Sequence, residues 1–150
     1  MNIDAGDYER VTFEKDQPLF IEGGSIDYFY IIVSGRVRII KESSGRVLSL
    51  ALLGDKAFVG EAAVFGDVGK RIASAVAETS TELIRIPAGD IKKVLSVTPE
   101  WVRNIMKTLS QRLQHTNDII AEHKIKDETG GTYNYLSEEE EAHYLKILKI

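Results

Sequence analysis

The strongest constraint on the fold of this chain is a change of hydrophobic period at Pro87. Before that residue, short segments rich in β-branched and aromatic residues, such as 28–40 and 47–53, are separated by turns that contain glycine. Segments of this kind are typical of β-strands, and their close spacing predicts an all-β barrel or sandwich over residues 8–86. After Pro87 the apolar residues recur at helical spacing. The chain is therefore predicted to be mainly β with flanking α-helices.

A long helix is predicted in the last third of the chain, over residues 99–126. Thr98 fits its N-cap and Pro99 its first position, and residues 87–95 fit a shorter helix before it. The long helix carries a seam with steps of four and three residues: Val102, Met106, Leu109, Leu113, Thr116 and Ile120. Such a seam either packs on the β-domain of the same chain or pairs with a second copy, and we favour the dimer. Trp101, in the first turn, is expected to pack against the β-domain.

Residues 127–150 are predicted to form a linker followed by a short C-terminal helix. Ser137 and Glu140 fit a capping box, and the acids at 138–141 suit the positive end of a helix dipole. Apolar residues between 144 and 150 give this helix one apolar side. The helix must therefore dock on another surface, in this chain or in a partner.

The composition argues against several classes of function. The 150 residues carry a formal net charge of −4, unlike the broad basic surface of a nucleic-acid binder. Because cysteine is absent, disulfides, cysteine-based zinc sites and thiol nucleophiles are excluded. The histidines at 115, 123 and 143 have no partner at a metal-ligand spacing, so we expect no metal site and no enzyme. No signal peptide or membrane-spanning run is evident, which predicts a cytoplasmic protein.

The segment GEAAVFGDVGKRIASAVAET, residues 60–79, sets Glu61 and Arg71 ten residues apart across a loop of small residues. Small residues let a backbone approach a ligand closely, and backbone N–H groups there suit an anion. Arg71 adds a fork that matches two phosphate oxygens, and Glu61 can accept hydrogen bonds from sugar hydroxyls. The combination predicts a site for a phosphorylated sugar. The alternative is a structural ion pair between Glu61 and Arg71 that closes the loop.

This segment resembles the phosphate-binding cassette of the cyclic nucleotide-binding domain family. That cassette reads roughly F-G-E-x-A/G-L, then a gap and R-x-A, and this chain has FVGEAAV from residue 58 and RIA from residue 71. Upstream, EG at 22 and YIIVSGRV from residue 30 resemble the family's E-G and Y-x-I-x-x-G-x-V strand pair. Downstream, RLQHT from residue 112 resembles the long helix of the bacterial catabolite activator branch.

The resemblance implies a β jelly roll, or double-stranded β-helix, followed by a long C-helix. It implies that Arg71 holds the exocyclic phosphate oxygens of a cyclic nucleotide and that Glu61 accepts from the ribose 2′-hydroxyl. Thr116 and Asn117 fall where the activator branch contacts the adenine edge, one of them from the partner subunit. The complete implied ligand-binding set is Gly60, Glu61, Ala62, Ala63, Arg71, Ile72, Ala73, Thr116 and Asn117. The binding domain would span residues 1–126, with 127–150 as linker and terminal helix.

Three departures from the family pattern bear on ligand and partner. Ile72 stands where cGMP-selective relatives have threonine, which disfavours cGMP, and its bulk would crowd the phosphate site. Asn117 replaces a serine-like residue but can still donate to and accept from a purine edge. The helix-turn-helix of the activator branch is missing, because residues 127–150 are too few to form one. We therefore expect no DNA binding by this chain.

These observations predict a receptor domain for cAMP, with cGMP as the alternative ligand, that couples binding to movement of its C-terminal helices. We expect a homodimer through residues 99–126, an effector protein of unknown identity, no cofactor, no catalytic residue and no membrane contact. Two other interpretations stay open. One is a jelly-roll interaction module that has lost its ligand, which Ile72 supports, and the other is a sensor fragment of a larger regulator.

Overall fold

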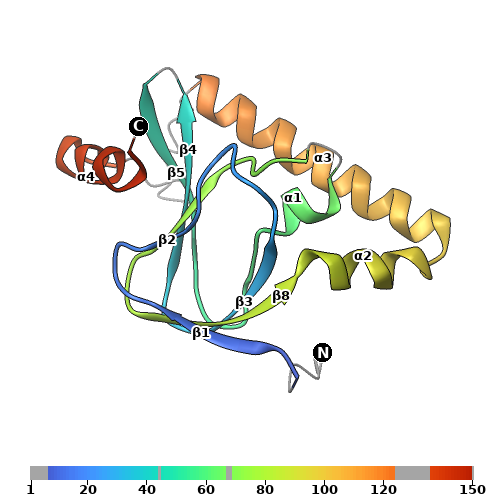
Figure 1. Cartoon of the computed structure of the whole chain (residues 1–150). Coiled ribbons are helices and arrows are strands. Elements are labelled where there is room, and N and C mark those ends of the chain that lie inside the picture. The colour runs from blue at the N-terminus through green and yellow to red at the C-terminus, as the bar shows by residue number, and fades with distance from the viewer. Residues whose placement is uncertain (1–6, 44, 67–68, 124–135, 150) are drawn as a thin grey trace.

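The computed structural model describes residues 7–43, 45–66, 69–123 and 136–149, which contain two four-stranded antiparallel sheets (Figure 1). The first sheet has the order β1 (Glu9–Phe13), β8 (Thr81–Pro87), β3 (Tyr28–Ser34) and β6 (Phe58–Val59). The second has the order β2 (Pro18–Phe20), β7 (Ser74–Ala77), β4 (Val37–Ser43) and β5 (Arg46–Leu53). The chain passes repeatedly from one sheet to the other. This arrangement confirms the predicted β jelly roll.

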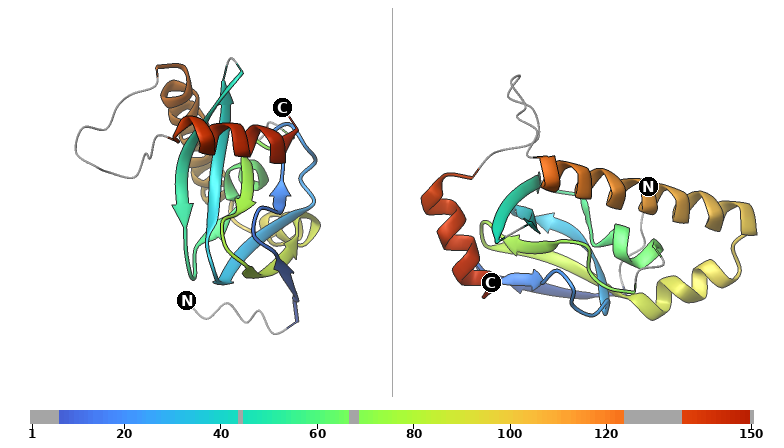
Figure 2. Two further views of the ribbon diagram at one scale, coloured as in Figure 1. Left: turned by 90° about the vertical axis from the view of Figure 1, so that its left-hand side faces the viewer. Right: turned by 90° about the horizontal axis from the view of Figure 1, so that it is seen from above.

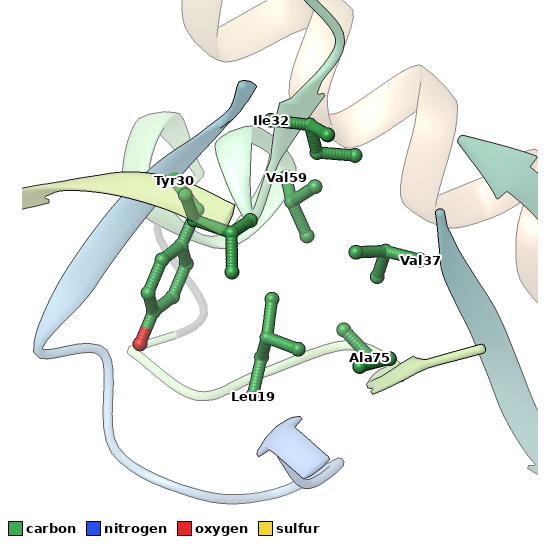
Figure 3. Close-up of a cluster of buried hydrophobic side chains, with 8 residues drawn as sticks. Leu19, Tyr30, Ile32, Val37, Val59 and Ala75 are labelled. Carbon is green, nitrogen blue, oxygen red and sulfur yellow. The ribbon is translucent and has the colours of Figure 1, made fainter. Parts of the chain in front are cut away.

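The hydrophobic core lies between the two sheets (Figure 3). Val59 and Leu83 from the first sheet and Val37 from the second are 0 % exposed. Leu19 and Tyr30 pack against the same cluster. Because β-branched and aromatic side chains fit the pleated, half-buried surface of a sheet, the segments identified by their composition form the strands that enclose this core.

Within the described ranges, four helices flank the sheets: α1 (Glu61–Phe65), α2 (Ala88–Ser96), α3 (Glu100–His123) and α4 (Glu138–Leu148). The two helices predicted after Pro87 are present as α2 and α3, and the predicted end of the long helix, 124–126, lies outside the described residues. The Thr98 hydroxyl, predicted to cap α3, donates to the Val94 carbonyl at 2.8 Å and so closes the end of α2. Helix α1 lies beneath α3 (Figure 1).

Helix α3 contacts the β-sandwich mainly near its C-terminal end. There Ile120 is buried and packs with Leu50 and Ala73. Toward its N-terminal end the helix runs away from the sheets, beside α2 (Figure 1). Trp101 is 66 % exposed, so the prediction that it packs against the β-domain is wrong: the first turn of α3 has no sheet to cover it. Leu109, in the predicted seam, is likewise 57 % exposed.

Helix α4 docks on the outer face of the second sheet of the same chain, across its strands (Figure 2). Tyr144 and Leu148 are buried against a cluster that includes Val47. Both Glu141 carboxylate oxygens accept hydrogen bonds from Arg46, at 2.7 and 3.0 Å, and one also accepts from the Val47 N–H. The predicted capping box of Ser137 and Glu140 is present. The apolar side of this helix therefore finds its surface within the chain.

Two further features concern the described residues as a whole. No helix among them is both long enough and apolar enough to cross a membrane. In the same part of the chain, no group of three or more histidine, aspartate or glutamate side chains is placed to hold a metal ion.

The core predicts a position-dependent cost for the same truncation. Val37→Ala should lower the free energy of unfolding by about 1–3 kcal/mol, because it removes two fully buried methyl groups and leaves a cavity. Val97→Ala removes the same groups from a side chain that is exposed, and it should change stability by less than about 0.5 kcal/mol. Urea denaturation followed by circular dichroism measures both. Equal effects would contradict the assignment of Val37 to the core.

Candidate functional site

Gly60 fixes the geometry at the start of α1. Its φ of 93° lies in the left-handed region that favours glycine. A Cβ built on this residue would lie 2.7 Å from Nη1 of Arg71, which is shorter than the contacts that Cβ atoms make in proteins. Backbone conformation and space therefore both require glycine here, and the requirement brings the backbone of Gly60 against the guanidinium of Arg71.

The Arg71 side chain is held on several sides and is only 4 % exposed. Its Nη2 donates to the Tyr28 carbonyl at 2.5 Å, and its Nε donates to the Ser25 carbonyl at 3.3 Å. Its guanidinium lies over the Phe20 ring, 3.9 Å from the ring centroid. Both of its hydrogen bonds thus go to neutral carbonyl oxygens rather than to a carboxylate.

One nitrogen of Arg71, Nη1, is buried and makes no hydrogen bond to any of the residues that the structure describes. Burial lowers the pKa of the Arg71 guanidinium, because the charged form loses its hydration. A buried guanidinium with an unused donor is a costly arrangement, which an anion at Nη1 would relieve.

The backbone of Arg71 is anchored to the glycine turn between β2 and β3. The Arg71 N–H donates to the Gly24 carbonyl at 3.1 Å, and the Gly23 N–H donates to the Arg71 carbonyl at 2.8 Å. Gly23 has a φ of 80°, which explains a glycine at the position where the sequence carries EG. The upstream and cassette motifs, about 50 residues apart in sequence, therefore meet at this arginine.

Glu61 lies in the first turn of α1, next to Gly60. Burial raises the pKa of its carboxyl group, and backbone hydrogen bonds from Glu61 and Gly60 partly oppose that effect. The structure contains no ion pair between Glu61 and Arg71, and neither group figures in the electrostatic environment of the other. The alternative of a structural Glu–Arg ion pair is therefore wrong. Arg71 is buried, Glu61 is half-buried, and neither side chain is paired with the other.

These residues line one small cavity of about 70 Å³. Eight of the nine predicted site residues are in its lining: Gly60, Glu61, Ala62, Ala63, Arg71, Ile72, Ala73 and Asn117. The ninth, Thr116, is exposed on α3 and is not in the lining. The structure thus brings the cassette and Asn117 of the long helix together within one chain, and it leaves Thr116 outside.

Four lining residues were not predicted: Phe20, Ile39, Leu53 and Leu113. Phe20 precedes the glycine turn and supplies the ring under Arg71. The alternation of β4 places Ile39 toward the cavity, but the sequence pattern alone does not say which face of that strand meets the cassette. Leu113 was assigned to the helix seam, and it also forms part of the cavity wall.

A second, larger cavity of about 680 Å³ lies beside the first, between α1, α2, α3 and the first sheet. Most of its lining is apolar, including Phe29, Phe58 and Phe65. Glu61, Ala62 and Leu113 line both cavities, so α1 and one turn of α3 separate them.

A family model described as "Cyclic nucleotide-binding domain" matches residues 10–97. The chain is 30% identical over 115 residues to the CRP-like cAMP-activated global transcriptional regulator of Mycobacterium tuberculosis, covering 76% of this chain and 51% of that protein. It is 31% identical over 111 residues to the cyclic AMP receptor protein of Thermus thermophilus, covering 73% and 51%. The chain therefore spans about half the length of these curated relatives.

The chain is also similar to several solved structures. The cAMP-bound form of the EAL enzyme Bd1971 matches with a TM-score of 0.69 and 30% identity, over 77% of this chain and 31% of that one. A cGMP-bound form of the same enzyme matches with a TM-score of 0.66 and 31% identity, over 71% and 28%. The catabolite activator protein of Thermus thermophilus matches with a TM-score of 0.62 and 27% identity, over 82% and 58%.

The buried carboxyl of Glu61 predicts a pH-dependent stability difference. Because burial raises its pKa in the folded state above the ordinary 4.5, the charged form is disfavoured by folding at neutral pH. Glu61→Gln should therefore raise the free energy of unfolding at pH 7. The gain should shrink as the pH falls through the raised pKa and vanish below about pH 4, where the wild-type carboxyl is protonated in both states. Denaturant titrations at several pH values measure it. Glu14→Gln, at an exposed position, should show no such trend.

Proposed function

We propose that this chain, which belongs to the cyclic nucleotide-binding domain family, is a receptor domain for cAMP that couples binding to its C-terminal helices. The observation that carries the proposal is the unpaired Nη1 of Arg71, buried beside Gly60 in the cavity. A fixed, desolvated cation with a free donor is suited to a phosphate, because a charge-assisted hydrogen bond there replaces an unmade one.

In this proposal each cassette residue has a chemical task. Arg71 donates to the exocyclic oxygens of the cyclic phosphate, and the carboxylate of Glu61 accepts from the ribose 2′-hydroxyl. The backbone N–H groups near Ala62 and Ala63 contribute at the sugar-phosphate end, where Gly60 allows close approach. The separation of Glu61 from Arg71 supports this division, because neither charge is consumed by the other.

In this proposal, α3 contacts the purine end of the ligand. Asn117 lines the cavity, and its amide can donate to and accept from a purine edge. Thr116 is exposed, which suits a contact made from the second subunit of a dimer to the neighbouring site. The names of the two curated relatives support cAMP, whereas the cGMP-bound form of the EAL enzyme keeps cGMP as the alternative.

Coupling would run through the helices that form the cavity wall. Helix α3 supplies Leu113 and Asn117 to the cavity and packs on α1, which carries the cassette. A ligand that contacts both α1 and α3 interacts differently with arrangements in which these helices are near or apart, and only such a difference can shift the equilibrium between them. We assign the domain a regulatory role without catalysis. In this role it acts on an effector that binds α3 or α4.

The strongest competing function is an interaction module that no longer binds a nucleotide. The cavity of about 70 Å³ and the half-buried Ile72 in its lining favour this candidate. The unpaired Nη1 of Arg71 speaks against it, because a site without a ligand gains nothing from a buried donor without a partner.

Isothermal titration calorimetry with cAMP and cGMP tests the proposed function. We expect saturable binding of one cAMP per chain and weaker binding of cGMP. Arg71→Ala should weaken cAMP binding about 30-fold or more, because truncating one partner of a buried charged hydrogen bond costs on the order of 2 kcal/mol or more.

Arg36→Ala, which removes the same group from an exposed turn, is the matched control and should leave binding unchanged. Circular dichroism checks that both variants are folded. A folded wild-type protein that takes up neither nucleotide would leave the interaction module as the function.

We further propose that the chain forms a homodimer through α3. Four large apolar side chains follow one another at steps of four residues and are exposed: Trp101, Ile105, Leu109 and Leu113. A stripe of this kind is typical of a helix that pairs with another helix. Leu109→Glu should shift the protein from dimer to monomer in sedimentation equilibrium, because it places a charge in the paired stripe. Gln111→Glu, on the same helix outside the stripe, should not, and a wild-type protein that is monomeric at 100 µM would refute the dimer.

A further inference from the structure

Lys41 of β4 joins three segments that are distant in sequence. Its Nζ lies 2.5 Å from Oε1 of Glu22, 3.0 Å from the carbonyl oxygen of Ile72 and 3.5 Å from Oδ1 of Asp118 on α3. The Lys41 side chain is 14 % exposed, whereas that of Asp118 is 48 % exposed. A single ammonium group therefore connects a loop of the sandwich, the end of the cassette and the long helix.

On the sandwich side, this arrangement is firmly fixed. The second carboxylate oxygen of Glu22 accepts from the Glu42 N–H at 3.1 Å, and the Glu22 N–H donates to the Ser74 hydroxyl at 2.8 Å. Lys41 itself is part of β4, which pairs with β5 at this position. Lys41 therefore has two rigid contacts and one, to Asp118, that depends on where α3 lies.

The two ends of this connection adjoin the ligand cavity. Ile72 directly follows Arg71, so the Lys41 bond to its carbonyl restrains the chain next to the proposed phosphate site. Asp118 directly follows Asn117, which lines the cavity from α3. The length of the Lys41–Asp118 contact therefore depends on the position of α3 relative to the cassette. Neither residue is among those proposed to touch the ligand.

The cavity in this arrangement is too small for a nucleotide. Its volume is about 70 Å³, whereas ligand pockets are about 300 Å³ or larger. The walls made by Ile39 and Leu53 belong to a hydrogen-bonded sheet, and the backbone of Arg71 is anchored to the glycine turn. The walls free to retreat are α1 and α3, which pack on each other. A nucleotide that enters must therefore displace the helix that carries Asp118.

We propose that the Lys41–Asp118 pair is a strap that holds α3 in the narrow-cavity position and thereby lowers the affinity of the site. This inference rests on the proposed function for the identity of the ligand. The contact is already 3.5 Å long, and outward movement of α3 lengthens and so weakens it. Occupancy of the site and an intact strap oppose each other, which makes Lys41 and Asp118 positioning residues for ligand entry.

The test is Asp118→Asn, which keeps the shape of the side chain and removes its charge. An ion pair with one half-exposed partner at 3.5 Å contributes little, so we expect cAMP to bind about two- to fivefold more tightly to the variant in calorimetry. Hydrogen exchange of the α3 amides over residues 113–120, measured without ligand, should be faster than in the wild type, because the helix is released from the sandwich.

Three further variants separate the strap from general charge effects. Glu100→Gln removes one acid from the other end of α3 and should change neither affinity nor exchange at 113–120. In a Lys41→Met background the partner of Asp118 is absent, so adding Asp118→Asn should have no further effect on either quantity.

Unchanged or weaker binding in Asp118→Asn, or an equal effect of this substitution with and without Lys41, would overturn the strap. Failure of the proposed function gives a different result. If the wild-type protein binds neither cAMP nor cGMP, the receptor is refuted, and the exchange rates of the wild type and its variants then decide alone whether Lys41 and Asp118 restrain α3.

Discussion

The arrangement of the site depends on the burial of Arg71, a cation whose side-chain hydrogen bonds go to neutral carbonyl oxygens. Its side chain is fixed by two backbone carbonyls and the ring of Phe20, yet one of its donors is unused. Gly60 is required because any Cβ there would strike the guanidinium, and the glycine turn at 23–24 is required because it anchors the arginine backbone. Two motifs that are about 50 residues apart in sequence are thus constrained by one charged group.

Around this fixed cation the jelly roll supplies a rigid frame, and the helices supply movable walls. The sheets are tied by hydrogen-bonded ladders and a shared core, whereas α3 is held at few points, chiefly by Ile120, by its packing on α1 and by the Lys41–Asp118 contact. The contacts that hold α3 are individually weak and can be exchanged for contacts with a ligand. In the proposed receptor, the site would therefore open without disturbing the sandwich.

The two faces of strand β4 contact different parts of the molecule. Ile39 and Lys41 point toward the cavity and α3, whereas Ile40 packs beneath α4 on the outer face. Alternation along a strand makes such a division unavoidable. The terminal helix is therefore only one strand away from the ligand cavity, although about 75 residues separate it from the cassette in the sequence.

The sequence by itself determined the strands, the helices after Pro87, the capping box of α4 and eight of the twelve residues that line the small cavity, because periodicity, turn chemistry and cassette spacing are local properties. It could not decide which surfaces meet. Trp101 was expected to be covered, but the first turn of α3 lies away from the sandwich. Glu61 and Arg71 could equally have formed an ion pair. The sequence also left open whether α4 docks on its own sheet or on a partner. These outcomes depend on the relative placement of elements distant in sequence, which only tertiary packing sets.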